Sequence, residues 1–150
     1  MTDLDRVVTA KKAGYEACFG CGAQNAIGIH IEGFERIDGG FGATFAPLPD
    51  HRGFEGLLHG GIVATALDEM LAWTATLEED VFVFTGKLEL RYRNPASPDE
   101  RYRLRGFLDE RRGRRLLLHG DCRNDAGEVV VEASGLYLVA AVDEATLAPT

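Results

Sequence analysis

The sequence predicts an α+β domain in which a curved antiparallel sheet of about six strands wraps around one long central helix. The helix is indicated by residues 62–77, where apolar residues recur at helical spacing and the only charges are Asp68 and Glu69. The sheet is indicated by stretches on both sides of this helix in which apolar and polar residues alternate between turn-forming residues. Because the helix is apolar on nearly every side, we expect other elements to enclose it.

The length and charge of the chain limit its class. Its 150 residues fit one domain with a sizeable core. We divide it into an N-terminal segment, residues 1–17, expected to be mobile or a short helix, and a single domain, residues 18–150. The net charge of −8 argues against general nucleic-acid binding. Neither a signal segment nor a membrane-length apolar stretch is present, so the expected location is cytoplasmic.

Two short strands are expected before the helix. Isoleucines that alternate with polar or small residues predict the first over residues 27–34, and residues 41–45 predict the second. Asp38-Gly39-Gly40 supplies a turn between them, so the two strands form a hairpin. A Gly-rich loop, residues 53–58, then leads the chain to His59.

Four longer strands are expected after the helix. The first covers residues 82–93 and ends at Asn94-Pro95-Ala96. In its alternation, Phe84 shares one face with the leucines, and Thr85 lies on the other face with the charged residues. The remaining three cover residues 102–108, 114–122 and 128–138, and the turns between them predict an antiparallel meander.

The entry to the helix is the strongest candidate for chemistry. Gly60 and Gly61 have no side chains, so a substrate can approach the free backbone N–H groups at a helix N-terminus, where developing negative charge is favoured. Asp68 lies on the buried helix, and a carboxylate there is costly unless it is paired, hydrogen-bonded or protonated. The segment therefore offers an oxyanion site and a candidate base, although Asp68 could also be a structural acid.

The order of hairpin, loop, His-Gly-Gly, buried helix with an acid, and meander resembles hotdog-fold acyl-CoA thioesterases of the PaaI-like type, in the 4-hydroxybenzoyl-CoA thioesterase superfamily. The resemblance covers nearly the whole chain after Cys18. The stretch Cys18-Phe19-Gly20-Cys21-Gly22, with Asn25 and Gly28, also resembles the opening of a subgroup of these proteins. The resemblance implies a hotdog fold and hydrolysis of an acyl-CoA thioester, with coenzyme A as part of the substrate and no separate cofactor.

The resemblance also implies roles for individual residues. The Gly60 N–H would polarise the thioester carbonyl, and His59 would position the thioester or simply end the loop. Asp68, nine residues after His59, would act as general base or nucleophile, and Thr85 would orient water. The loop asparagine that many members carry six residues before the histidine is replaced by Gly53, so its role would be absent or supplied by a neighbour: His51, Arg52 or Glu55.

Helix geometry predicts a shared site. Eight residues of helix separate Gly60 from Asp68, a rise of about 12 Å, which is too far for both to contact one carbonyl carbon. If both act on one thioester, Gly60 of one subunit must face Asp68 of another, as in an isologous homodimer. The family resemblance points the same way, and often to a dimer of dimers.

Further residues are candidates for binding the substrate. They are Gly61, Gly53, Phe54 and Glu69 near the reacting centre, with Arg91 and Arg93 for the phosphates of coenzyme A. Ten of the sixteen Lys and Arg residues are arginines between Arg91 and Arg123, and solvated strand faces account for most of them. The apolar residues Met70, Trp73, Phe54, Leu57 and Phe84 could shape an acyl pocket or belong to the core.

The sequence gives no expectation of a metal site. Cys18 and Cys21 form a lone Cys-x-x-Cys, and a structural zinc would need two more ligands, for which only His30 and Cys122 are available. We therefore expect a tight turn with small apolar thiols.

Two rival functions remain. A hotdog dehydratase or hydratase would carry a different active-site motif, which is not found. A non-catalytic acyl-CoA-binding or sensing protein is favoured by the missing loop asparagine, whereas the presence of Asp68, Gly60 and Thr85 argues against it.

Overall fold

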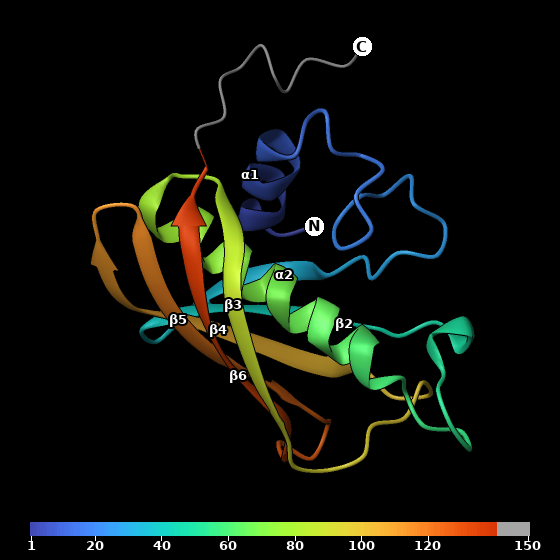
Figure 1. Ribbon diagram of the computed structural model, residues 1–150. Helices are drawn as coiled ribbons and strands as arrows, with labels where there is room; N and C mark the ends of the chain where they lie inside the picture. The colour runs from blue at the N-terminus through green and yellow to red at the C-terminus, as the bar shows by residue number, and fades with distance from the viewer. Residues whose placement is uncertain (141–150) are drawn as a thin grey trace.

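The computed structural model describes residues 1–140 (Figure 1). Six strands form one sheet in the order β1-β2-β4-β5-β6-β3, and every neighbouring pair is antiparallel. The predicted α+β hotdog architecture is confirmed, with the sheet packed around the long helix α2. The elements are α1 (Asp3–Lys11), β1 (Glu32–Ile37), β2 (Gly40–Phe45), a 3-10 helix (Pro49–His51), α2 (Gly60–Glu79), β3 (Val83–Tyr92), β4 (Tyr102–Arg112), β5 (Arg115–Arg123) and β6 (Val129–Val139).

The domain boundaries stay a prediction. Residues 141–150, which the prediction includes in the domain, lie outside the described residues. In the predicted N-terminal segment, α1 begins with a capping box in which the Thr2 side chain and Asp5 exchange hydrogen bonds. Asp5 also accepts from the Phe34 backbone N–H at 2.9 Å, which ties α1 to β1. Within residues 1–140, no helix has the length and apolar character needed to cross a membrane.

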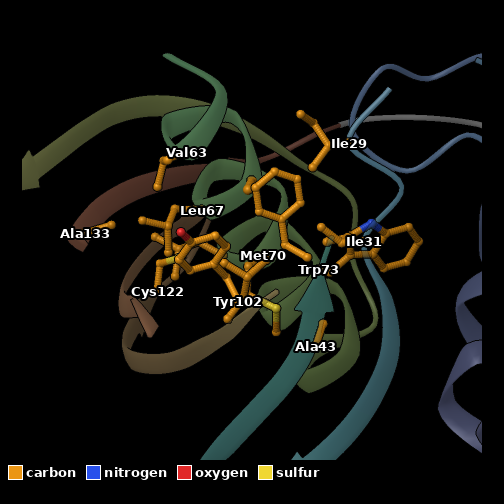
Figure 2. Packing of buried hydrophobic residues seen from close by; sticks show 14 of the residues in the cluster. Ile29, Ile31, Ala43, Val63, Leu67, Met70, Trp73, Tyr102, Cys122 and Ala133 are labelled. Carbon is orange, nitrogen blue, oxygen red and sulfur yellow. The ribbon is translucent and has the colours of Figure 1, made fainter. Parts of the chain in front are cut away.

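The core lies between α2 and the sheet. Nine residues of α2 are buried, and its apolar side chains form one core cluster with buried side chains of the sheet. Figure 2 shows Val63, Leu67 and Met70 of α2 in one cluster with Tyr102 and Cys122 of the sheet. The helix is enclosed because it is apolar on most sides, as its sequence predicts.

The first predicted strand is wrong over its first half, because β1 begins at Glu32 rather than at residue 27. The alternating isoleucines lie in an irregular segment that buries only two of them: Ile29 and Ile31 are buried, whereas Ile27, which a strand would place on the same face, is 61% exposed. His30 has a positive φ of 50°, and the Ile29 N–H donates to Phe19 O at 2.7 Å rather than to a strand. A buried loop can therefore imitate the period of a strand.

The two faces of β3 also differ from the prediction. The pairing with β6 shifts between Thr85 and Lys87, so Gly86 is an extra residue in a bulge. A one-residue insertion exchanges the faces of a strand. Thr85 therefore lies on the helix-facing side with Leu88 and Leu90, and not with the charged residues as the simple alternation predicted.

Candidate active site

The start of α2 presents one backbone donor, the Gly60 N–H, that is free within the described residues. His59 is the N-cap, and its Nδ1 accepts from the Gly61 N–H at 2.9 Å. The Gly60 N–H makes no hydrogen bond within residues 1–140, and both glycines are exposed. Tyr92 donates its hydroxyl to the Gly60 carbonyl at 2.6 Å and so fixes this turn to β3. The first turn thus holds an accessible donor in a rigid frame.

Asp68 lies two turns further along α2 and is held through one oxygen. Its Oδ1 accepts from Thr85 Oγ1 and from the Tyr137 hydroxyl, each at 2.8 Å. Its Oδ2 accepts no hydrogen bond from any residue in 1–140. Two donors therefore orient the carboxylate, and its second oxygen stays available to a substrate or to water.

Tyr137 is a site residue that the sequence analysis missed. It is fully buried on β6 and pairs with Thr85 across the two strands. Burial raises the pKa of its phenol, and the neighbouring Asp68 carboxylate raises it further. The phenol therefore stays protonated and donates to the carboxylate. Only the register of β3 and β6 reveals this contact, so no local sequence signal could have found it.

Glu69 points into a different environment from Asp68. It is partly buried beside the Cys18 and Cys21 thiols, and the Cys18 Sγ lies 3.8 Å from its Oε1. Burial raises the pKa of the Glu69 carboxyl, and the adjacent Asp68 charge raises it further. Burial likewise raises the pKa of the Cys21 thiol, with Glu69 adding to the effect. Glu69 also lines a cavity of about 240 Å³ with Trp73, a part of the molecule distinct from the start of α2.

Gly53 packs directly against the N-cap. A Cβ at this position would lie 3.1 Å from the His59 Cα, which is closer than ordinary contact. Of the neighbours considered as replacements for the absent asparagine, His51 is already engaged: its Nδ1 accepts from the Leu48 N–H and its Nε2 donates to Ile27 O. Arg52 and Glu55 are exposed.

The two arginines considered for the phosphates of coenzyme A, Arg91 and Arg93, lie in different surroundings. Arg93 lines a cavity of about 270 Å³ with Gly60, and its guanidinium pairs with Glu132 at 3.0 Å. Arg91 alternates with Leu90 and Tyr92, whose side chains face α2, so Arg91 faces away from the helix.

The candidate pocket residues divide into two groups. Met70 and Trp73 belong to the buried core. Phe54, Leu57 and Phe84 are exposed. The interpretation that these three residues belong to the hydrophobic core of a single chain is therefore wrong. Phe84 and Trp73 both line the cavity beside Glu69.

The architecture and the arrangement at α2 define a hotdog-fold protein. A model of the thioesterase superfamily matches residues 55–131, just over half of the chain, and the protein therefore belongs to this superfamily. The matched segment includes α2, which carries Asp68, and β3, which carries Thr85.

Several solved structures share this fold. A thioesterase superfamily protein is 30% identical over 79% of this chain, with a TM-score of 0.70, and this chain covers 61% of it. A phenylacetic acid degradation-related protein from Ralstonia eutropha JMP134 is 24% identical (74% of this chain, 86% of that one, TM-score 0.65). A hypothetical thioesterase from Streptococcus pneumoniae TIGR4, solved with coenzyme A, is 18% identical (71% of this chain, 86% of that one, TM-score 0.66). No similar sequence was found among curated proteins.

Proposed function

We propose that the protein hydrolyses an acyl-CoA thioester to a free acid and coenzyme A. The observation that carries the proposal is the Asp68 carboxylate, held at Oδ1 by two hydroxyl groups and unbonded at Oδ2. Superfamily membership supports the reaction class. The structural neighbours from Streptococcus pneumoniae, solved with coenzyme A, and Streptococcus mutans, solved with acetyl-CoA, support coenzyme A as the carrier.

The chemistry needs two groups at the carbonyl: a donor to its oxygen, and a base or nucleophile beside its carbon. Thioester hydrolysis develops an oxyanion, which the free Gly60 N–H at the positive end of α2 would stabilise by a few kcal/mol. As general base, Asp68 Oδ2 would take a proton from a water molecule that attacks the carbonyl carbon; the C–S bond then breaks, and the coenzyme A thiolate leaves and is protonated. As nucleophile, it would attack the carbonyl carbon itself and displace the same thiolate, and water would then hydrolyse the resulting anhydride to release the acid. His59 uses Nδ1 as the cap acceptor, so its Nε2–H would be the atom that contacts the thioester.

The proposed active unit is a homodimer. Gly60 and Asp68 belong to one unbroken helix, so their separation along it stays about 12 Å and one chain cannot place both on a single carbonyl. β3 supports pairing with a second copy, because it is the last strand of the sheet and carries Phe84 at 62% exposure. An isologous dimer would hold two equivalent sites, each built from Gly60 of one subunit and Asp68 of the other.

The test is free-thiol release from a panel of short, medium, long and aryl acyl-CoAs. We expect wild type to turn over part of the panel and Asp68→Asn to lose about 10²–10⁴-fold in kcat, the usual contribution of a positioned acid or base. Glu78→Gln is the matched control, because Glu78 is an exposed carboxylate on the same helix that pairs with Arg36. Equal turnover by Asp68→Asn and wild type would contradict the assigned role.

The second candidate is a non-catalytic acyl-CoA-binding protein. The specific observation in its favour is Gly53 at the loop position, where His51 is already engaged and does not supply the missing group. In that case wild type would release no thiol from any substrate, while acyl-CoA would still raise its melting temperature.

A further inference from the structure

The Cys18-Phe19-Gly20-Cys21 turn lies against α2 at Glu69, one residue from Asp68. The Cys18 and Cys21 sulfurs and a Glu69 carboxylate oxygen all lie within 4.8 Å of one another. Cys21 is 6% exposed, and Cys18 and Glu69 are partly buried. This third group is neither His30 nor Cys122, the further ligands that the sequence offered.

The turn is shaped around the carboxylate. A Cβ at Gly20 would lie 2.1 Å from the Cγ and Cδ of Glu69, so any other residue there would push the carboxylate away from the thiols. A Cβ at Gly22 would lie 2.3 Å from Glu16 O, and the Gly22 N–H donates to Cys18 O at 2.8 Å. The two glycines therefore allow a tight turn that brings both sulfurs to the same side chain.

The donor set suits a borderline-soft divalent ion. Zinc bonds of about 2.3 Å to sulfur and 2.0–2.2 Å to carboxylate oxygen place tetrahedral ligand atoms roughly 3.6–3.8 Å apart. The three atoms need to approach by no more than about 1 Å to reach that spacing. Two thiolates, a carboxylate and a divalent ion carry one net negative charge, and Lys12 lies beside them with its Nζ donating to Cys21 O at 2.6 Å.

The fourth coordination position of such a metal site would not be filled by the protein. The three residues line the cavity of about 240 Å³ that also contains Lys12 and Trp73. We propose that Cys18, Cys21 and Glu69 bind a divalent transition-metal ion, zinc by ligand type, with its fourth position facing this cavity. An open position leaves room for water or for a small donor group of a ligand.

The test uses the full chain, reduced and treated with a chelator, and cobalt(II) as a spectroscopic probe. We expect one cobalt per chain, with a thiolate-to-cobalt charge-transfer band and the visible bands of a tetrahedral site, both lost when zinc is added. Cys21→Ser and Glu69→Gln should each weaken binding more than about 100-fold, because even groups that only support a metal ligand contribute about 10–100-fold. Binding is read without substrate, so the result is independent of thioesterase activity.

Cys122→Ala is the matched control, because Cys122 is a buried thiol on β5 outside the cluster. It should bind cobalt as wild type does. Absence of a thiolate band at one equivalent of cobalt would overturn the proposal and leave the thiols as simple S–H donors to Glu69. Wild-type affinity in Glu69→Gln would overturn it as well, and this near-isosteric variant decides the matter if circular dichroism shows that Cys21→Ser does not fold.

Discussion

At the scale of single residues, the two hydroxyl groups on Asp68 Oδ1 determine how the carboxylate is presented. Tyr137→Phe and Thr85→Val each remove one donor with little change of shape. A hydrogen bond to a charged group is worth about 1.5–3 kcal/mol. We therefore expect each variant to lower kcat by about tenfold or more, measured by thiol release. The double variant should lose more than the sum of the two free energies, because either donor alone can still orient the same oxygen.

The control for this prediction is Tyr102→Phe. Tyr102 is equally buried, but its hydroxyl donates to Ser97 O at 3.0 Å, away from Asp68. It should lower the melting temperature without a selective fall in kcat. A parallel fall in kcat for both tyrosine variants would show that general stability, not the presentation of Asp68, is responsible.

At the scale of elements, His59 serves two roles that substitution can separate. Its Nδ1 caps α2, and its Nε2–H is proposed to contact the thioester. His59→Ala should cost about 0.5–2 kcal/mol of stability through the lost cap. Both His59→Ala and His59→Asn should lower kcat/KM, because both remove the imidazole Nε2–H, but His59→Asn should restore most of the lost stability, because Asn is a favoured N-cap. If activity returns along with stability in His59→Asn, the imidazole has no role beyond the cap.

The strands β4 and β5 are joined by an ion pair that predicts a pH dependence. Asp121 is 8% exposed; burial alone would raise its pKa, but the Arg105 and Arg123 guanidinium groups outweigh this and the pKa is lowered. A carboxyl group whose pKa is lowered in the folded state stabilises the fold at pH values above its unfolded-state pKa. This stabilisation is lost as the pH falls through its folded-state pKa. Asp121→Asn should therefore be less stable than wild type by about 1.5–3 kcal/mol at neutral pH.

The measurement is urea unfolding from pH 7 to pH 3. The difference between wild type and Asp121→Asn should shrink below pH 4, since protonation removes the same charge that the substitution removes. Asp125→Asn, in the exposed turn that follows β5, should match wild type within about 0.5 kcal/mol. A difference that stays constant with pH would show that the charge of Asp121 does not stabilise the pair.

The elements also show what local pattern can and cannot predict. Helix α2 and the meander were predictable because their periods extend over many residues and are set by one buried face. The segment before β1 was not, because Ile29 and Ile31 are buried by a loop that only imitates alternation. The face of Thr85 was not predictable either, since Gly86 adds a residue that becomes visible only in the pairing with β6.

In the candidate site too, some features could be predicted from local sequence pattern and others could not. Asp68, Gly60 and His59 lie in one segment, so their spacing along a helix could be predicted from the sequence. Tyr137 contacts Asp68 across 69 positions of the chain, and the Cys18 contact to Glu69 spans 51 positions. Such contacts depend on strand register and on loop placement, which no local period encodes.

At the scale of the whole molecule, the proposed site belongs to a pair of chains, and two inactive variants can test this. Gly60→Pro removes the N–H donor at the first helical position, where proline is well tolerated. The preceding His59 has φ −62° and ψ 131°, a conformation that a following proline accepts. We therefore expect Gly60→Pro to fold and to lose thioesterase activity, as Asp68→Asn does.

Mixed dimers of these two variants should recover activity. A site built from Gly60 of the Asp68→Asn chain and Asp68 of the Gly60→Pro chain is intact, whereas the second site of the same dimer lacks both groups. Random mixing by refolding together should therefore restore about a quarter of wild-type activity, because half of the dimers are mixed and each has one intact site. Neither variant refolded with itself should recover. If the mixture stays inactive although light scattering shows dimers, Gly60 and Asp68 do not act on the same thioester across the interface.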